Sequence, residues 1–147
     1  SLYALLYGIG LNYVIAIPFF LFVPVNETWY IHPGVLPLYL KAYPLFEEQY
    51  RFFSGLDNSF PSLHTSISLT LATIAYRSRN IRFARIAAVS AAVILFSVIY
   101  LGIHWYADVI AGIVLASIAT SFAYRLSDYP LGTHQLMLPS PSKARAE

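Results

Sequence analysis

Two long segments with at most one charged residue each most constrain what this chain can fold into. Residues 2–25 contain no Asp, Glu, Lys or Arg, and residues 86–124 contain Asp108 as their one formally charged side chain. A helix needs about 20 consecutive apolar residues to cross a bilayer, so the first segment can form one span and the second can form two. Hydrophobic residues make up 58% of the chain and charged residues 11%, against roughly 45–50% and about 25% in soluble domains. The chain is therefore predicted to lie in a membrane.

A third apolar segment, residues 59–76, carries only His64 as a possible charge. Backbone polar groups in hydrocarbon must be satisfied within their own segment, which favours helices. A turn near Gly102 is expected to divide the longest segment into two helices. We therefore predict an all-α integral membrane helical bundle with four transmembrane helices, at about residues 2–25, 59–76, 86–103 and 106–124.

These helices are expected to form a single domain over residues 1–125. Residues 26–58 contain three prolines beside apolar stretches, and we predict that they form an outer, partly helical loop lying on the membrane surface. Residues 126–147 contain further prolines and end in a polar stretch, so they are expected to be a flexible C-terminal tail.

The arginines predict how the chain is oriented. Residues 77–85 contain four Arg, and Arg125 closes the last predicted span. Cytoplasmic loops carry an excess of Lys and Arg, so both regions are predicted to face the cytoplasm. The loop 26–58 and the turn at His104 then share the extracytoplasmic face. The net charge of +2 is too small to indicate a nucleic-acid partner, and the absence of Cys excludes a thiolate nucleophile or thiolate metal site.

Three ionisable side chains, His64, His104 and Asp108, are predicted to meet on that extracytoplasmic face. His104 and Asp108 are four residues apart, so they are neighbours on a helix, and the carboxylate can orient the imidazole. Ser59 can cap the second helix, whose free amides would attract an anion. Two imidazoles and a carboxylate suit phosphoryl chemistry, in which one His attacks phosphorus and the other protonates the departing oxygen.

The residue pattern leaves other interpretations open. An interfacial His is commonly a hydrogen-bonded residue of the aromatic belt, and Ser62 can be a helix cap alone. The two His and Asp108 can also hold zinc or another divalent metal. A transporter or channel would need a polar residue in mid-span, for which Asn12 is the candidate, although a lone Asn commonly packs between helices.

Two short motifs resemble those of a known family. Residues 61–64, PSLH, resemble the PSGH motif of the type 2 phosphatidic acid phosphatase superfamily. Residues 100–112 contain His104 and Asp108 as HxxxD before a helix, and they resemble the third motif of that family in order and spacing. The resemblance implies that His104 is the nucleophile, that Asp108 orients it and that His64 is the general acid.

The resemblance also carries expectations about the rest of the protein. It implies that Ser62 and Leu63 lie beside the phosphate of a lipid phosphoester, and that neither a metal nor another cofactor is required. Members of this architecture have six spans, which implies two further spans upstream of this chain.

The chain departs from the family pattern in its cations. Val98 stands where the third motif has Arg, Leu63 stands where the second motif has Gly, and the KxxxxxxRP motif is absent. Lys41 and Arg51 in the outer loop are candidates to donate to the phosphate. Each can also be an ordinary interfacial cation.

Loss of the third-motif Arg makes the chain more similar to one branch, the inositol phosphorylceramide synthase-like and sphingomyelin synthase-like phosphotransferases. A phosphodiester carries less negative charge than a phosphomonoester and needs fewer cations. The resemblance therefore favours transfer of a lipid headgroup through His104 over hydrolysis. The alternatives are a lipid phosphate phosphatase and a catalytically degenerate lipid-binding membrane protein.

Overall fold

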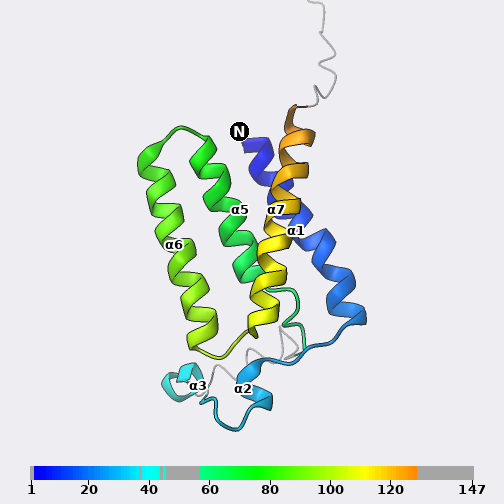
Figure 1. Cartoon of the computed structure of the whole chain (residues 1–147), viewed down its shortest axis with the longest axis vertical. Coiled ribbons are helices and arrows are strands. Elements are labelled where there is room, and N and C mark those ends of the chain that lie inside the picture. Colours follow the sequence, from blue (N-terminus) through cyan, green and yellow to red (C-terminus); the bar gives the residue numbers. More distant parts are fainter. Residues whose placement is uncertain (1, 37, 44, 46–56, 129–147) are drawn as a thin grey trace, which may run out of the picture.

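The computed structural model describes residues 2–36, 38–43, 45 and 57–128, and every regular element within them is a helix. The main body is a four-helix bundle (Figure 1), formed by α1 (Leu2–Phe22), α5 (Leu63–Arg77), α6 (Ile81–Tyr100) and α7 (Tyr106–Asp128). Two short helices, α2 (Thr28–Ile31) and α3 (Leu38–Ala42), lie beyond one end of the bundle. The predicted all-α helical bundle is confirmed.

Helix α5 is the central element, because it packs against α1, α6 and α7. Its buried face is rich in small hydroxyl side chains rather than large apolar ones, as expected where helices approach closely in a membrane; these are Thr65, Ser66, Ser68 and Thr70. Asn12 on α1 donates to Thr70 Oγ1 at 3.1 Å and accepts from the hydroxyl of Ser66. Asn12 therefore joins α1 to α5, as a polar residue between packed helices commonly does.

Among the described residues, three helices are long and apolar enough to cross a membrane: α1, α6 and α7. Their outward faces expose large apolar side chains such as Leu21, Phe22 and Phe96, and the chain is an integral membrane protein. The fourth predicted span differs, because α5 has 15 residues and begins at Leu63 instead of residue 59.

The late start of α5 has a local cause. Ser62 is the N-cap, and its hydroxyl accepts from the backbone N–H of Thr65 at 3.3 Å. Residues 59–61 precede this cap and are not helical. The expectation that Ser59 caps the helix is therefore wrong, and Ser59 is available for another contact.

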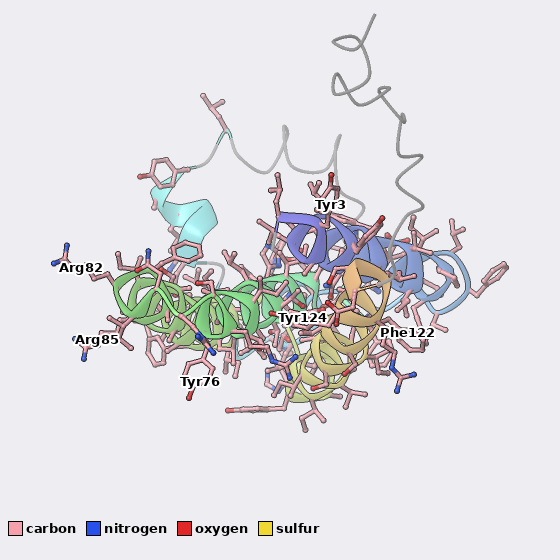
Figure 2. The ribbon with its side chains drawn as sticks, turned by 90° about the horizontal axis from the view of Figure 1, so that it is seen from above. Tyr3, Tyr76, Arg82, Arg85, Phe122 and Tyr124 are labelled. Atoms are coloured by element: carbon pink, nitrogen blue, oxygen red, sulfur yellow. The ribbon has the colours of Figure 1, made fainter. Side chains whose placement is uncertain are left out.

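The described arginines belong to the α5–α6 turn, the helix ends beside it and the last turn of α7, which lie at the end of the bundle opposite α2 and α3 (Figure 1). Asn80 caps α6 by accepting from the backbone N–H of Phe83 at 3.2 Å, so α6 reaches back to Ile81. Arg82 and Arg85 consequently lie on the first turns of a helix and not in a connecting loop. Seen from this end in Figure 2, both side chains project outward from α6.

The last described helix is longer than the sequence indicates. Helix α7 continues to Asp128, past the predicted end at residue 124. Residues 129–147, most of the predicted tail, lie outside the described residues, as does Arg51 of the outer loop. Within the described part of the predicted loop 26–58, α2 and α3 are the helical segments.

Candidate active site

The starts of α5 and α7 bring the candidate residues together at one end of the bundle. His64 is the second residue of α5, Asp108 is in the first turn of α7, and His104 lies in the turn before α7. The backbone N–H of Ser62 donates to the carbonyl of Asp108 at 3.1 Å, which ties the two helix starts directly to each other. Residues 40 positions apart in sequence therefore share one site.

The turn that carries His104 depends on a glycine. Gly102 has φ +68°, the left-handed conformation that glycine adopts without steric cost. Its carbonyl accepts from the backbone N–H of Trp29 at 2.9 Å, and the indole N–H of Trp105 donates to the carbonyl of Asn26 at 2.9 Å. These two contacts hold the segment after α1 against the turn and place Glu27 beside the site.

The two imidazoles are in direct contact. His64 Nδ1 lies 3.1 Å from His104 Nε2, and the ring centroids are 5.4 Å apart. Their surroundings differ, because His104 is buried at 7% exposure whereas His64 is exposed. The His104 ring is thus enclosed by the protein, whereas the His64 side chain reaches the surface.

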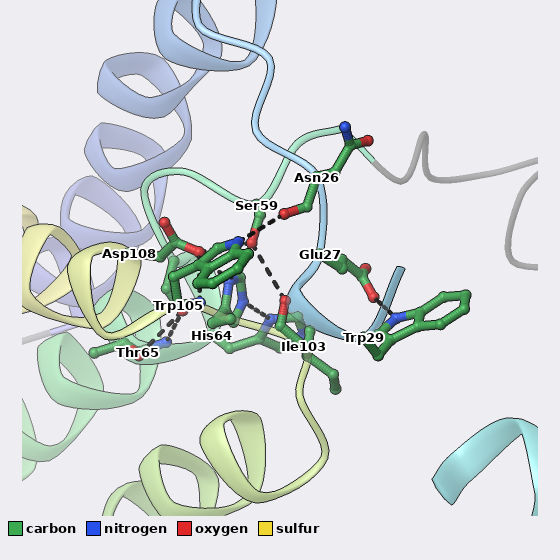
Figure 3. A network of polar contacts seen from close by, with 11 residues as sticks. Asn26, Glu27, Trp29, Ser59, His64, Thr65, Ile103, Trp105 and Asp108 are labelled. Carbon is green, nitrogen blue, oxygen red and sulfur yellow. Dashed lines mark hydrogen bonds and ion pairs between the residues drawn. The ribbon is translucent and has the colours of Figure 1, made fainter. Parts of the chain in front are cut away.

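Ser59 lies beside Asp108 (Figure 3) and also contacts His104. Its Oγ lies 2.7 Å from Asp108 Oδ2 and 3.0 Å from His104 Nδ1. Asp108 Oδ2 is farther from His104 Nδ1, at 3.5 Å, so the hydroxyl makes the shorter contact with each group and bridges them. The sequence suggested a cap for Ser59 and gave no signal that it would bridge these two residues.

The chemistry of these groups assigns the His104 tautomer. A carboxylate only accepts hydrogen bonds, so the single Ser59 proton goes to Asp108, which is its shortest contact. The Ser59 oxygen is then left to accept from His104, which places the ring proton on Nδ1. Nε2 keeps its lone pair and faces His64. Asp108 is itself fixed, since it is 1% exposed and also accepts from the backbone N–H of Trp105 at 2.9 Å.

A small cavity of about 100 Å³ opens onto this pair, and we call it the catalytic pocket. It is lined by Phe20, Glu27, Asn58, Ser59, Leu63, His64, Ile103 and His104. None of these described lining residues is Lys or Arg. Glu27 is 2% exposed, and its carboxylate accepts from the indole N–H of Trp29 (Figure 3). Glu27 is not among the residues that the sequence predicts for the site; its one signal there is an acidic residue directly after an uncharged span.

The other residues predicted to contact the substrate differ in whether they line the catalytic pocket. Leu63 lines the catalytic pocket. Ser62 is fully buried, and its hydroxyl donates to Thr65 Oγ1 at 3.1 Å, so it lies beside the pocket and not in its lining. Lys41 is exposed on α3 and is not among the residues that line the pocket.

The geometry does not suit a metal site built from the two His and Asp108. His104 directs Nε2 to His64 and Nδ1 to Ser59 and Asp108, so its two partners lie on opposite sides of the ring. Metal ligands must instead converge on one point. Within the described ranges, no group of three His, Asp or Glu side chains is arranged to hold an ion.

Comparison with known proteins gives a family. A family model described as PAP2 superfamily matches residues 3–130, which is most of the chain. Neither the curated proteins nor the solved structures gave a match. The match to the family model means that the chain belongs to the PAP2 superfamily. With the apolar helices, membership indicates a membrane enzyme of the lipid phosphatase or phosphotransferase type.

Proposed function

We propose that this chain cleaves or transfers a lipid phosphoester by nucleophilic attack of His104 Nε2 on phosphorus. One observation carries the proposal: a buried imidazole whose Nδ1 is held by Ser59 presents Nε2 to an exposed second imidazole. A nucleophile oriented by a third group and paired with an acid–base partner is the arrangement that phosphohistidine chemistry needs.

The first chemical step forms one bond and breaks another. His104 Nε2 bonds to phosphorus while the bond from phosphorus to the lipid alcohol oxygen breaks. His64, as imidazolium, gives its proton to that leaving oxygen. The positive charge that develops on His104 is stabilised by Asp108 through the Ser59 hydroxyl.

The second step regenerates the enzyme. His64, now neutral, takes the proton of an acceptor hydroxyl, whose oxygen bonds to phosphorus as the phosphorus–nitrogen bond to His104 breaks. Water as the acceptor gives hydrolysis, and a bound alcohol gives transfer. A phosphoryl group must fit between the two nitrogens, which are 3.1 Å apart, so the exposed His64 side chain swings aside when substrate enters.

The charges of the catalytic pocket favour a phosphodiester and hence headgroup transfer. The described lining contains the buried Glu27 and no Lys or Arg, so a phosphomonoester dianion would be poorly compensated there. We propose an inositol phosphorylceramide synthase-like headgroup transfer as the activity. A lipid phosphate phosphatase is the second candidate, in which Lys41 or Arg51 of the outer loop supplies the missing cation.

The proposal includes the placement of the catalytic unit. Residues 1–125 would form the transmembrane catalytic domain, with the catalytic pocket on the extracytoplasmic face and residues 77–85 in the cytoplasm. The support is the separation of the arginine-bearing turn from the histidine pair at opposite ends of the bundle (Figure 1).

A labelling experiment tests the function. The purified chain in lipid vesicles is given a ³²P-labelled lipid phosphodiester or phosphomonoester, quenched in alkali and assayed for phosphohistidine and for released products. We expect label on the wild type and on the control His32→Ala, which lies outside the catalytic pocket. We expect none on His104→Ala. Failure of the wild type to label or turn over either class would favour a catalytically degenerate lipid-binding protein.

A further inference from the structure

A second, larger hollow adjoins the catalytic pocket. It has a volume of about 450 Å³ and shares Leu63 and His64 with the pocket. We call it the α5–α6 groove; it is lined by Tyr13, Leu63, His64, Ile67, Ser68, Leu71, Ala87, Ser90, Ala91 and Ile94. Unlike the pocket, the groove has no carboxylate and no residue of the α6–α7 turn among its described lining residues.

Three helices build this groove. Its floor is one face of α5, where successive turns present residues 63–71. At about 1.5 Å per residue this floor is roughly 12 Å long. One wall is α6, whose small Ala87, Ser90 and Ala91 leave the space unfilled, and Tyr13 of α1 forms part of the other wall. The result is an apolar channel that leads from His64 along the helices toward the middle of the bundle.

The position of His64 indicates which part of the substrate lies in the groove. His64 lines both hollows, whereas His104 and Glu27 line the catalytic pocket and are absent from the groove lining. In the proposed chemistry His64 protonates the leaving oxygen, so whatever is attached to that oxygen lies on the groove side. The phosphoryl group and its polar substituent stay on the side of Glu27 and Asn58.

We infer that the α5–α6 groove binds the hydrocarbon chain of the leaving lipid alcohol. The inference rests on the proposed function and adds the part of the substrate that leaves. Its support is the apolar lining, the continuity with the catalytic pocket through Leu63 and His64, and the length of the floor. A chain held there fixes the leaving oxygen beside His64 and so positions phosphorus before His104 attacks it.

The test is the dependence of activity on chain length. The substrates are water-soluble phosphodiesters and phosphomonoesters of straight-chain alcohols from butyl to decyl, and the released alcohol is measured. For the wild type, kcat/KM should rise with chain length, at most about fourfold per methylene buried from water. The rise should stop where the chain fills the groove.

A filling variant gives the discriminating result. Ser90 is exposed and lines the groove, so Ser90→Phe adds a ring to the hollow without entering the buried contact between α5 and α6. It should flatten the dependence on chain length and leave butyl substrates unaffected. Ala91→Leu, at a buried position, should do the same in part. The matched control is Ala92→Phe, on the same helix but outside the groove lining, which should behave as the wild type.

Two outcomes would overturn the inference while leaving the proposed function standing. One is an unchanged chain-length dependence in Ser90→Phe. The other is an equal loss at every chain length, which would mean damage to the catalytic pocket.

A binding measurement separates the inference from catalysis. A decyl phosphodiester with a diazirine at the end of its chain is photolysed with the inactive His104→Ala variant, with and without Ser90→Phe. Labelling of α5 and α6 that Ser90→Phe removes supports the chain site, even if no substrate is turned over and the proposed function fails. Labelling spread over all apolar helix faces would mean that the groove is filled by bulk lipid, and the inference would fall.

Discussion

At the scale of single residues, the site depends on a serine hydroxyl that contacts both a carboxylate and an imidazole. Asp108 Oδ2 lies 3.5 Å from His104 Nδ1, whereas the Ser59 hydroxyl lies 3.0 Å from it. The hydrogen bond with Ser59, which in turn donates to Asp108, is therefore the main contact that keeps the ring proton on Nδ1. All three groups are buried, so water does not replace a lost member at low cost.

Replacement of Ser59 by Ala should therefore slow the chemical step more than it weakens binding. Without the hydroxyl, His104 Nδ1 keeps only the longer 3.5 Å contact to Asp108 Oδ2. The reactive tautomer is then held less firmly, so kcat should fall about a hundredfold with KM little changed. Steady-state kinetics on the preferred phosphoester measures this. Ser117→Ala, an exposed helix serine bonded to Ile113, is the control. An equal change in kcat for both variants would contradict the positioning role.

Glu27 should decide how much charge the pocket tolerates. Its buried carboxylate repels a phosphomonoester dianion more than a phosphodiester monoanion, and a single charge at this range is worth about tenfold or more. Glu27→Gln removes the charge and keeps an oxygen for Trp29. The ratio of kcat/KM for monoester to diester should rise about tenfold. Glu27→Asp, which keeps the charge, should leave the ratio near that of the wild type; a ratio unchanged by Glu27→Gln would remove Glu27 from substrate selection.

At the scale of elements, the catalytic geometry is set by how closely α7 approaches the start of α5. A Cβ built on Gly112 of α7 would lie 2.6 Å from the carbonyl oxygen of Ser62 and 3.0 Å from Thr65 Cβ. The first neighbour is backbone and cannot rotate away. The same approach permits the hydrogen bond from Ser62 N–H to the carbonyl of Asp108.

Gly112→Ala should consequently damage activity and stability together. The methyl group pushes the two helix starts apart, which separates His64 from His104 and costs about 1–3 kcal/mol of overpacking strain. Thermal unfolding in detergent and the phosphohistidine assay measure the two effects. Gly10→Ala is the matched control, because a Cβ at Gly10 meets nothing within 4 Å. Wild-type labelling by Gly112→Ala would mean that the site does not depend on this close approach.

The helices also differ in how well the sequence predicts them. Uncharged runs and their length sufficed for α1, α6 and α7, because a membrane span depends mainly on local composition. The start of α5 was misplaced, because Ser59 and Ser62 are both good caps and only tertiary contacts decide between them. The contact of His64 with His104 followed from topology and motif, but Glu27 and the groove depend on packing between distant segments, which periodicity does not encode.

At the scale of the whole molecule, the two ends of the bundle carry different kinds of side chain. The arginines of the α5–α6 turn and of α6 lie at one end, and the histidine pair with α2 lies at the other (Figure 1). The helices α6 and α7 connect these ends and are long enough to cross a bilayer. A chain built in this way should therefore expose its two ends to different compartments.

Thiol labelling can test that orientation, because the chain contains no Cys. Ser78→Cys places a unique thiol in the α5–α6 turn, and Tyr30→Cys places one on exposed α2. In intact bacterial cells expressing the chain, a membrane-impermeant maleimide should label Tyr30→Cys and spare Ser78→Cys until the membrane is opened. The reason is that the arginine-rich end is retained in the cytoplasm. Labelling of Ser78→Cys alone in intact cells would reverse the proposed orientation, and labelling of both would mean that α6 does not separate the two compartments.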